Sequence, residues 1–411
     1  MKKALLYILF AIAPISAAKS QDYSGVYKFR YDYVMVEGTI DVVEYDGGKD
    51  IVFLPCSQVL EKRQVSDDQI QKVNNKKDCK SGGHEQQRGI QDPFGGTLID
   101  VVGRQRLNCG VSSGFAGFAY VDSGGDWQGF DVSVCRAVAA AVLGDPDAVE
   151  FIPTTGKTRF TALASGEIDV LARNTTWTFS RDVDLKFEFV GVNYYDGQGF
   201  MVPKALGVSS AKELDGATVC IQTGTTTELN LADFFRSNNI SYEPVPIETN
   251  AEAQQQYLAG ACDVYTTDAS GLAATRATFE YPGDHVLLPE IISKEPLGPM
   301  VRHGDDEWGD VVRWTLNALI SAEELGVTSA NVEAMAAGSD NPEVNRLLGN
   351  EGDLGELLGL DPNWALRAIA AGGNYGEIFA KNLGSETPIG LARGLNSQWT
   401  DGGLLYSPPF R

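Results

Sequence analysis

Two stretches of the sequence carry side chains suited to binding a small anion. RNTTWTFSR, residues 173–181, places hydroxyls between two arginines directly after the apolar run IDVLA. An arginine guanidinium grips a carboxylate with two parallel hydrogen bonds. GTTTEL, residues 224–229, follows a second apolar run, and its Thr225-x-x-Glu228 spacing predicts a capping box at a helix start. The unpaired amides of a helix N-terminus also bind anions.

A third stretch, CDVYTTDAS at residues 262–270, ends its apolar run at Asp268. That carboxylate either caps the helix predicted for ASGLAATRATF or accepts hydrogen bonds from a ligand ammonium group. Each of the three features alone is more typical of an ordinary surface arginine or a capped helix. Taken together, a cation from one segment and amides with a carboxylate from two others predict a site for an α-amino acid, which carries both charges.

The elements that must position these residues alternate between strand and helix from about residue 97, which is typical of an α/β fold. ASGEIDVLARNTT (164–176) and LAGACDVYTTDAS (258–270) repeat one order: helix end, glycine, strand, polar cluster. Ligands bind at the carboxyl ends of strands in open α/β sheets. The pattern predicts two similar lobes around a cleft, with residues 190–204 and 287–301 as the two crossings of a hinge.

The motifs SGEIDVLARNTTWTFSRD, CIQTGTTTELNLADFFR and LPEIISKEPLGPMVRHGDDEW resemble those of periplasmic solute-binding proteins of amino-acid ABC importers, closest to the general L-amino-acid type. The resemblance covers roughly residues 97 to 411. It implies an α/β, two-lobed type II (Venus-flytrap) fold and no cofactor. It also implies a protein that captures a free L-amino acid and delivers it to inner-membrane permease subunits driven by a cytoplasmic ATPase.

The resemblance also implies a set of ligand contacts. Arg181 and Thr176 would hold the ligand carboxylate, and Asp268 would take the ammonium group. Asn174 would add a contact to the ammonium group. Two further hydroxyl residues would close on the carboxylate from the second lobe: Thr225 and Thr226.

Three positions bear on the ligand side chain. Phe115 stands where the family places a ring over the ligand, and a core position is an equal alternative. Ser112 stands where relatives for basic amino acids carry an acid, which disfavours basic ligands. Arg173 replaces a small residue, so it either lines the side-chain pocket and favours acidic or polar ligands, acts as a lid, or lies on the surface.

The composition and the N-terminal residues limit where the protein acts and what it binds. The 55 acidic and 33 basic residues give a net charge of -22, which argues against nucleic acid or anionic membrane as partners. MKKALLYILFAIAPISAAKS has the basic start, apolar core and small-residue end of a secretory signal peptide. We therefore predict a soluble monomer in the periplasm.

Six cysteines in an exported chain suggest disulfides, although six allow fifteen pairings. They occur as three sequential pairs: Cys56 and Cys79, Cys109 and Cys135, Cys220 and Cys262.

The predicted domain organisation has five parts. Residues 1–18 are the signal peptide, and residues 19–95 form an extra β-rich segment to which we assign no role. Residues 96–195 with 292–345 form lobe 1, residues 196–291 form lobe 2, and residues 346–411 form a C-terminal extension that packs on lobe 1.

An enzyme of the same fold is the alternative, namely a periplasmic dehydratase that acts on a small carboxylate. Asp268 would then serve as a general acid or base. The three histidines, at positions 84, 285 and 303, are scattered, and the sequence has no G-x-S-x-G, H-E-x-x-H or C-x-x-C motif. The sequence therefore favours a binding protein without catalysis.

Overall fold

The computed structural model describes residues 96–411 in full, and the backbone alone of residues 26–31, 34–45, 48–55, 63–64 and 70–74. The chain divides into two compact units, Met1–Ile90 and Gln91–Arg411, and each is described by itself. The predicted signal peptide, Cys56 and Cys79 lie outside the described residues.

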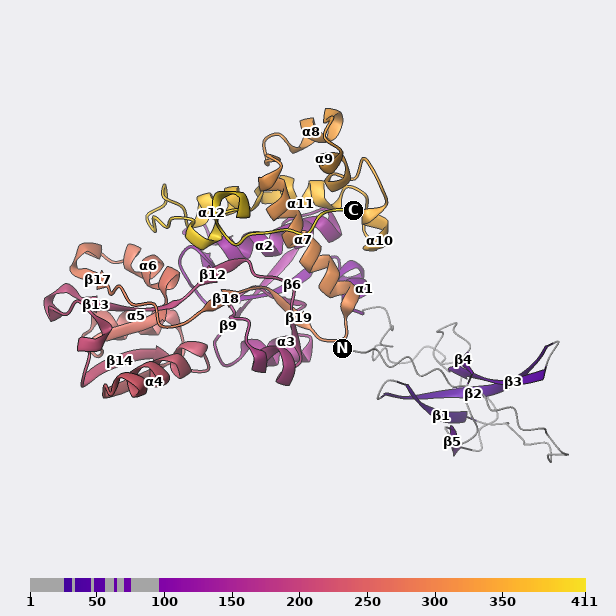
Figure 1. The fold of residues 1–411 in the computed structure, drawn as a ribbon, viewed down its shortest axis with the longest axis horizontal. Coiled ribbons are helices and arrows are strands. Elements are labelled where there is room, and N and C mark those ends of the chain that lie inside the picture. The colour runs from indigo at the N-terminus through magenta and orange to yellow at the C-terminus, as the bar shows by residue number, and fades with distance from the viewer. Residues whose placement is uncertain (1–25, 32–33, 46–47, 56–62, 65–69, 75–95) are drawn as a thin grey trace. The chain divides into compact units, whose positions relative to one another are not determined.

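The first unit contains a five-stranded antiparallel sheet in the order β4-β3-β2-β1-β5, drawn in indigo in Figure 1. The pairing of β2 with β3 extends to Tyr45 and Gly48. The strands are β1 (Val26–Tyr31), β2 (Val34–Tyr45), β3 (Gly48–Pro55), β4 (Arg63–Gln64) and β5 (Ile70–Asn74).

The second unit is built on two five-stranded sheets with the same arrangement. In each, three parallel strands are followed by one antiparallel strand and then by a fifth strand that is antiparallel to the fourth, in the orders β9-β6-β10-β19-β11 and β15-β14-β16-β13-β17. The sheet of lobe 1 contains β6 (Leu107–Ser112), β9 (Val149–Thr154), β10 (Val170–Leu171), β11 (Phe187–Phe189) and β19 (Met300–Arg302). The sheet of lobe 2 contains β13 (Gln198–Pro203), β14 (Ala217–Gln222), β15 (Tyr242–Ile247), β16 (Val264–Asp268) and β17 (His285–Leu287).

The repeated sequence pattern accounts for this likeness, because β10 and β16 are the third strands of their sheets. The helix before β10, α3 (Arg159–Ser165), ends at Gly166, whose φ of 78° is a left-handed conformation that favours glycine. Helices cover the faces of both sheets and bury their apolar sides. They are α1 (Gly96–Arg104), α2 (Phe130–Leu143) and α7 (Asp306–Glu324) in lobe 1, and α4 (Thr226–Asn238), α5 (Asn250–Leu258) and α6 (Ala269–Ala277) in lobe 2.

Two antiparallel strands connect the lobes. β12 (Tyr194–Asp196) pairs with β18 (Glu295–Leu297), and the two ribbons run between the lobes in Figure 1. Both strands lie in the segments predicted as crossings. The register places Asp196 opposite Glu295, so the connection itself brings two carboxylates to the junction of the lobes.

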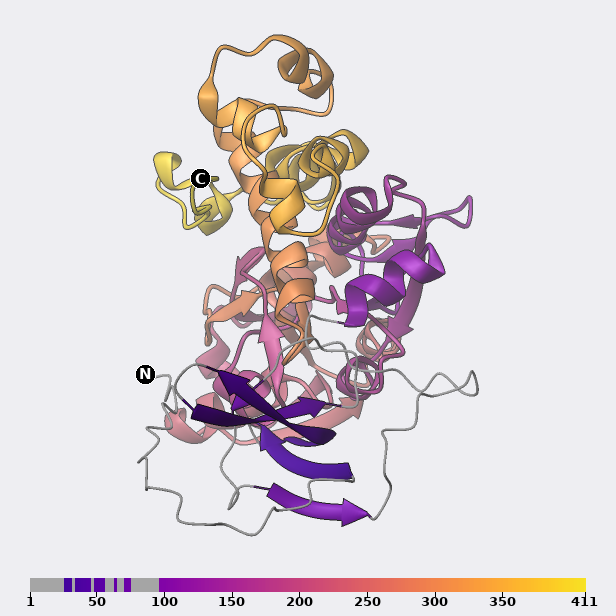
Figure 2. The same ribbon diagram turned by 90° about the vertical axis from the view of Figure 1, so that its right-hand side faces the viewer.

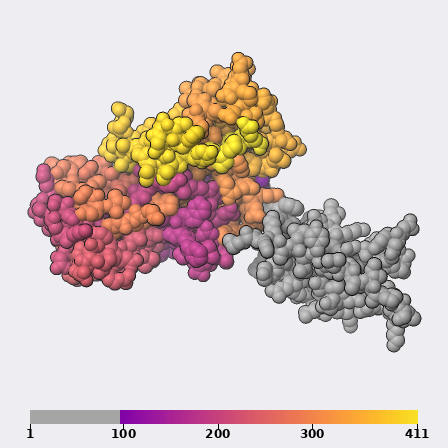
Figure 3. All heavy atoms as spheres, in the orientation of Figure 1, coloured from indigo at the N-terminus to yellow at the C-terminus, as the bar shows by residue number. Residues whose placement is uncertain are grey.

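The C-terminal residues pack against lobe 1. Their apolar side chains share one core with α2 and α7. Figure 2 shows these helices beside the long orange α7, and Figure 3 shows the yellow C-terminal residues as a band along the surface. The elements are α8 (Val332–Gly338), α9 (Pro342–Leu347), α10 (Leu354–Leu357), α11 (Trp364–Gly372) and α12 (Tyr375–Asn382).

Each lobe contains one disulfide. Cys109 in β6 bonds Cys135 in α2, and Cys220 in β14 bonds Cys262 just before β16. Two of the three sequential cysteine pairs are thereby confirmed. In residues 96–411, no helix has the length and apolarity needed to cross a membrane.

Candidate functional site

The predicted ligand residues lie where the parallel strands of the two sheets end, next to the crossing strands. Arg173, Asn174 and Thr176 follow β10, while Asp268 is the last residue of β16. Thr225 occupies the N-cap position of α4, the helix that follows β14. We call this group of residues, with the neighbouring Glu295, the strand-end site.

Arg181 lies in a short π-helix, Ser180–Asp184, and its side chain turns back into the site and is buried. Its Nη1 donates to the main-chain oxygen of Thr176 at 2.8 Å. The guanidinium carbon lies 5.2 Å from the centre of the Phe160 ring, a cation–π contact. Burial lowers the pKa of Arg181 to about 10, against the opposing effects of Glu295 and Asp268. Arg181 remains a cation at neutral pH, as the grip on a carboxylate requires.

Glu295 links the two lobes and was missed by the sequence analysis. Its buried carboxylate accepts hydrogen bonds from the hydroxyl of Thr176 in lobe 1 and, at 3.0 Å, from that of Thr226 in lobe 2. Asn230 Nδ2 of α4 and Ser293 Oγ donate to its other oxygen at 2.7 and 2.6 Å. Two of the three threonine hydroxyls predicted to hold a ligand carboxylate, those of Thr176 and Thr226, therefore already donate to a carboxylate of the chain.

Helix α4 begins where predicted, but the predicted capping box does not form. The hydroxyl of Thr225 donates to the oxygen of Gln222 at 2.6 Å instead of accepting from the helix. The carboxylate of Glu228 accepts from the amide of Gly224 at 3.1 Å. The amides in the first turn of a helix have no partner within the helix. These amides of α4 are suited to meet an anion.

Asp268 is buried, and within residues 96–411 its carboxylate accepts no hydrogen bond from another side chain or amide. It does not cap α6 through its side chain. Burial raises the pKa of Asp268 well above its usual value, and the negative charges of Asp196 and Glu295 raise it further. A carboxylate in this state gains most from a ligand that brings its own positive charge.

Asp196, on the crossing strand β12, was not predicted. Its carboxylate accepts from the amide of Gly197 and from both the amide and the hydroxyl of Ser270 at the start of α6. Burial raises the pKa of Asp196 to about 6 despite these bonds. The crossing thus holds the start of α6, and with it Asp268, in place.

Asn174 has a φ of 34°, an uncommon conformation for a residue other than glycine. Its amide donates at 3.1 Å to Asp131 Oδ2, and its own side-chain oxygen has no partner. Asp131, in the first turn of α2, was also missed. Burial raises its pKa to about 7, while the bonds from Asn174 and Asn193 and the charge of Arg173 act against this rise.

Arg173 is buried, so the surface alternative is wrong. Its Nε donates to the main-chain oxygen of Thr154 at 3.1 Å. Burial lowers the pKa of Arg173 to about 10, and the charge of Asp131 acts most strongly against this decrease. A third buried arginine, Arg159, was missed because the sequence TGKTRF shows only a helix start. Its Nη1 reaches the hydroxyl of Thr175 at 3.3 Å, and its Nε has no partner.

Phe115 belongs to the core of lobe 1 and also reaches lobe 2. Its ring stacks on Phe118 with centres 5.2 Å apart. A Cβ added to Gly271 in α6 would lie 2.3 Å from the end of the Phe115 ring, so the ring touches that backbone. Ser112, at the end of β6, is buried, and its hydroxyl has no partner. Ser112 thus ends a parallel strand of lobe 1, and Phe115 reaches the helix that follows Asp268.

The lobes are closed on each other. Lys157 Nζ of lobe 1 pairs with Glu248 Oε1 of lobe 2 at 2.9 Å. The hydroxyls of Thr176 and Thr226 lie 3.3 Å apart. A Cβ on Gly156 would lie 2.7 Å from the oxygen of Thr223, so the backbones meet closely at the rim. Such contacts between lobes form and break when two domains close and open.

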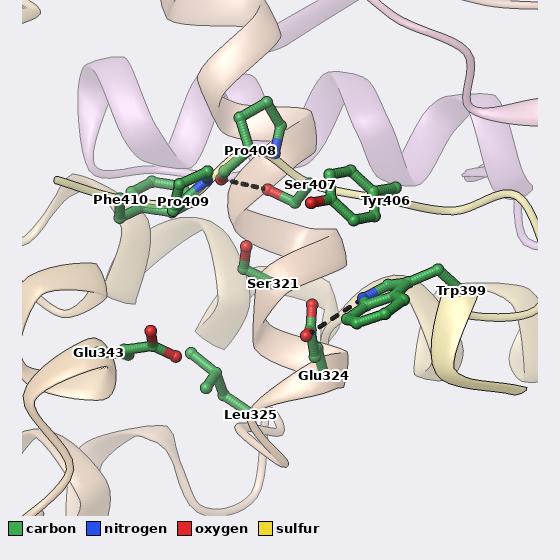
Figure 4. A pocket seen from close by; sticks show the side chains of 10 residues that line it. All are labelled: Ser321, Glu324, Leu325, Glu343, Trp399, Tyr406, Ser407, Pro408, Pro409 and Phe410. Atoms are coloured by element: carbon green, nitrogen blue, oxygen red, sulfur yellow. Dashed lines mark hydrogen bonds between the residues drawn. The ribbon is translucent and has the colours of Figure 1, made fainter.

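A separate pocket of about 170 Å³ lies between α7 and the C-terminal tail. Figure 4 shows Trp399 at its edge, with its Nε1 donating to Glu324 at 3.2 Å. Its charged lining residues are Glu324 and Glu343, so it lacks the cation that a carboxylate ligand requires. Within residues 96–411, no group of His, Cys, Asp and Glu is arranged to hold a metal ion.

The chain matches the bacterial extracellular solute-binding proteins, family 3, over residues 107–330. It is 67% identical over 315 residues to the glutamate/glutamine/aspartate/asparagine-binding protein BztA of Rhodobacter capsulatus, across 77% of this chain and 93% of that protein. It is 57% identical over 317 residues to the general L-amino acid-binding periplasmic protein AapJ of Rhizobium johnstonii, again across 77% of this chain and 93% of that protein.

A solved structure of an ABC transporter/periplasmic binding protein from Brucella ovis with glutathione bound is 56% identical to the chain. It superposes with a TM-score of 0.75 over 77% of this chain and 99% of that one. The two sheets, their crossing strands and this likeness define a two-lobed periplasmic binding protein of type II. The chain belongs to family 3 of the bacterial extracellular solute-binding proteins.

Proposed function

We propose that the protein is the substrate-binding component of an amino-acid ABC importer and captures L-amino acids of broad side-chain type. One observation carries the proposal: Arg181 of lobe 1 and Asp268 of lobe 2 are buried at the same junction, each acting on the other's pKa. A zwitterion with a carboxylate and an ammonium group complements this pair. The family, and the names of BztA and AapJ, support amino acids as the ligand class.

In the proposed cycle, the ligand carboxylate binds Arg181 and the first-turn amides of α4. Its ammonium group binds Asp268, whose carboxylate accepts no other hydrogen bond in residues 96–411. Lobe 1 thus supplies the cation and lobe 2 supplies amides and the acid. A ligand that contacts both lobes stabilises the closed form, which is the form that a permease can distinguish from the open one.

The same proposal places the protein in the periplasm as a monomer, delivering its ligand to inner-membrane permease subunits with a cytoplasmic ATPase. It includes no catalysis, since BztA and AapJ are named as binding proteins. The contacts proposed here address the groups common to all α-amino acids. D-isomers should bind weakly, because their side chains would point in a different direction from the same three-point attachment.

The test is a ligand scan on protein that has been unfolded and refolded to remove carried-over ligand. The melting temperature is measured with each L-amino acid, several D-isomers and glutathione. A ligand at a hundred times its Kd should add about 2.7 kcal/mol to the free energy of unfolding. Arg181→Ala should abolish the stabilisation by every amino acid, whereas Arg236→Ala, at an exposed position on α4, should not.

Stabilisation by several L-amino acids, lost in Arg181→Ala, would support the proposal. A response to glutathione alone would replace amino acids with a peptide as the ligand. If no amino acid or peptide stabilised the protein but a keto or hydroxy acid did, the dehydratase-like alternative would return.

A further inference from the structure

The middle residue of the crossing strand β12 is bonded by a side chain from the C-terminal tail, the residues after α12. Tyr195 lies opposite Pro296 of β18, which has no amide and whose oxygen accepts from the amide of Trp177 at 2.8 Å. The main-chain groups of Tyr195 instead meet Asn396. Its Oδ1 accepts from the amide at 2.7 Å, and its Nδ2 donates to the oxygen at 3.1 Å. Asn396, which is 4% exposed, therefore takes the place of a residue in a third strand.

A second side chain of the C-terminal residues bonds the residue that precedes β12. Tyr375, in the first turn of α12, donates its hydroxyl to the main-chain oxygen of Asn193 at 2.8 Å. Tyr375 is buried, and its ring packs against Phe130 of α2 with centres 5.6 Å apart. The beginning and the middle of this crossing are thus attached to elements that belong to lobe 1.

The tail is itself fixed to lobe 1 where it meets the crossing. Arg393 Nε donates to the main-chain oxygen of Asn396 at 2.8 Å. Its two Nη atoms donate to the carboxylate of Glu323 on α7 at 2.8 and 3.0 Å, the paired geometry that holds a guanidinium in one orientation. The guanidinium carbon also lies 5.1 and 5.0 Å from the ring centres of Tyr375 and Phe379. Asn396 therefore stands on a rigid support.

The partners of the crossing change from lobe 1 to lobe 2 between two consecutive residues. Tyr195 is bonded to the tail, whereas the carboxylate of Asp196 accepts from the amide and the hydroxyl of Ser270. The oxygen of Gly197 accepts from the amide of Ala269 at 2.8 Å. Ala269 and Ser270 begin α6 of lobe 2. Movement between the lobes must therefore bend this crossing at the link between residues 195 and 196.

We propose that Asn396 and Tyr375 are positioning residues for the closure of the two lobes. They fix β12 to lobe 1, so that lobe 2 turns about the link between Tyr195 and Asp196. The inference rests on the proposed function, because closure matters when it traps a ligand. A crossing that bends at one link reaches the closed arrangement in a larger fraction of its conformations than one that bends along its whole length. The apparent affinity for a ligand rises with that fraction.

The test is isothermal titration of the ligand-free full-length protein and its Asn396→Ala variant with L-glutamate and L-alanine. Asn396→Ala leaves both main-chain groups of Tyr195 without this partner. We expect both ligands to bind about tenfold more weakly and by the same factor, because the change affects closure and not the ligand contacts. Tyr375→Phe keeps the ring and removes one hydrogen bond, so both ligands should bind about threefold more weakly.

Asn382→Ala is the matched control. Asn382 is a buried asparagine of α12, and its side chain donates to Ile378 and Ser133, away from the crossing. This variant should lower the melting temperature as Asn396→Ala does, but it should leave both affinities unchanged. Binding and stability are thereby separated. If Asn396→Ala did not fold, Tyr375→Phe would carry the same test with a smaller change in affinity.

Hydrogen exchange measured by mass spectrometry locates the bend. In the unmodified protein, a peptide that contains Tyr195 should exchange slowly with and without L-glutamate, because the contact with Asn396 persists in the open form. In ligand-free Asn396→Ala the same peptide should exchange faster. Slow exchange in the unmodified protein only when glutamate is bound would overturn the inference, since the contact would then break on opening.

Three titration results would also overturn the inference. Unchanged affinities in Asn396→Ala with a lowered melting temperature would show that Asn396 only stabilises the fold. An equal loss in Asn382→Ala would show a general effect of destabilisation, and a loss for one ligand alone would indicate an effect on the ligand side chain. If the unmodified protein bound neither amino acid, the proposed function would fail, and this inference with it. If it bound both, and Asn396→Ala bound them equally well, the inference alone would fail.

Discussion

The strand ends of lobe 1 carry three buried arginines, Arg159, Arg173 and Arg181, with one acid, Asp131. Those of lobe 2 carry the acid Asp268 with hydroxyls and helix amides. Yet the two sheets have the same strand order and directions. The comparison shows that the repeated fold provides two equivalent positions at its strand ends. In the proposed function, the side chains placed there decide which end of a zwitterion each lobe holds.

The crossing strands contribute two further acidic residues, which belong to neither of the two five-stranded sheets. Asp196 and Glu295 face each other there, and their carboxylates bond to residues of both lobes. Buried charges of one sign are costly unless paired. The arginines of lobe 1 lie close enough to act on Asp268 and Glu295, so the two lobes neutralise each other when they are closed. The charge difference between the lobes is therefore also an attraction between them.

The sharpest way to break the comparison is to neutralise the acid of lobe 2. Asp268→Asn keeps the shape of the side chain but removes its charge. We expect L-glutamate to bind roughly a hundredfold more weakly, because the ligand ammonium group would lose its buried partner. Glutarate and 2-hydroxyglutarate, which lack the ammonium group, should lose nothing. Isothermal titration of the three ligands measures the difference.

Asp263→Asn is the matched control, since Asp263 precedes the opposite end of the same strand β16 and bonds Thr218. It should leave all three affinities unchanged. Equal weakening of all three ligands by Asp268→Asn would show that Asp268 supports the site without touching the ammonium group, and the assignment of charges to the two lobes would be wrong.

The second prediction concerns the link between the lobes. Glu295→Gln keeps the size of the side chain but replaces charge-assisted hydrogen bonds to Thr176 and Thr226 with neutral ones. We expect the closed form to be less stable and the ligand to dissociate about tenfold faster, because charge-assisted bonds are the stronger kind. Stopped-flow measurement of dissociation provides the rate.

The opposite result would also be informative. Tighter ligand binding by Glu295→Gln would mean that Glu295 competes with the ligand carboxylate for the two hydroxyls, and does not simply hold the lobes together. A control variant must change a residue outside the junction of the lobes without disturbing the core. Gln398→Glu is unsuitable, because Gln398 is buried and its side chain donates to Glu323. Glu243→Gln, on the exposed part of β15, is suitable and should leave the dissociation rate unchanged.

The sequence predicted the parts of the site that directly follow a strand. Thr176, Arg181 and Asp268 were found because a strand end is visible in the sequence and its position in the sheet follows from the fold. Arg159 and Glu295 were missed because one lies on a helix and the other on a crossing strand, and the sequence does not show which side chains of these elements turn toward the site. Their roles depend on the packing of α3 and on the register of β12 with β18, which no local pattern shows.

Two side chains of the candidate site form contacts that the local sequence does not show. Trp177 is 40% exposed, stacks on Phe189 and donates to Asp182. Thr225 has the right spacing for a capping box, but its hydroxyl bonds to Gln222. In both cases a side chain found a partner that only the folded chain brings near. Local spacing predicted where helix α4 begins but not which hydrogen bonds the side chains of its first turn form.

The smallest expected effect is on the pH dependence of stability, and it concerns Asp131, the acid of lobe 1. The pKa of Asp131 is raised to about 7 by burial, above an unfolded value near 3.9. Between these values the folded protein binds the extra proton, so the free energy of unfolding should rise as the pH falls through 7. The gain from pH 7 to pH 6 should be about 1 kcal/mol.

Asp131→Asn is neutral at every pH and can still accept from the amide of Asn174, so this part of the pH dependence should be absent from the variant. Urea unfolding of both ligand-free proteins at several pH values between 6 and 8 measures the difference. Asp196 and Asp268 act in the same direction in both proteins and cancel in the comparison. Identical slopes would show that Asp131 stays ionised beside Arg173, and lobe 1 would then hold a permanent ion pair where we predict an acid that takes up a proton near neutral pH.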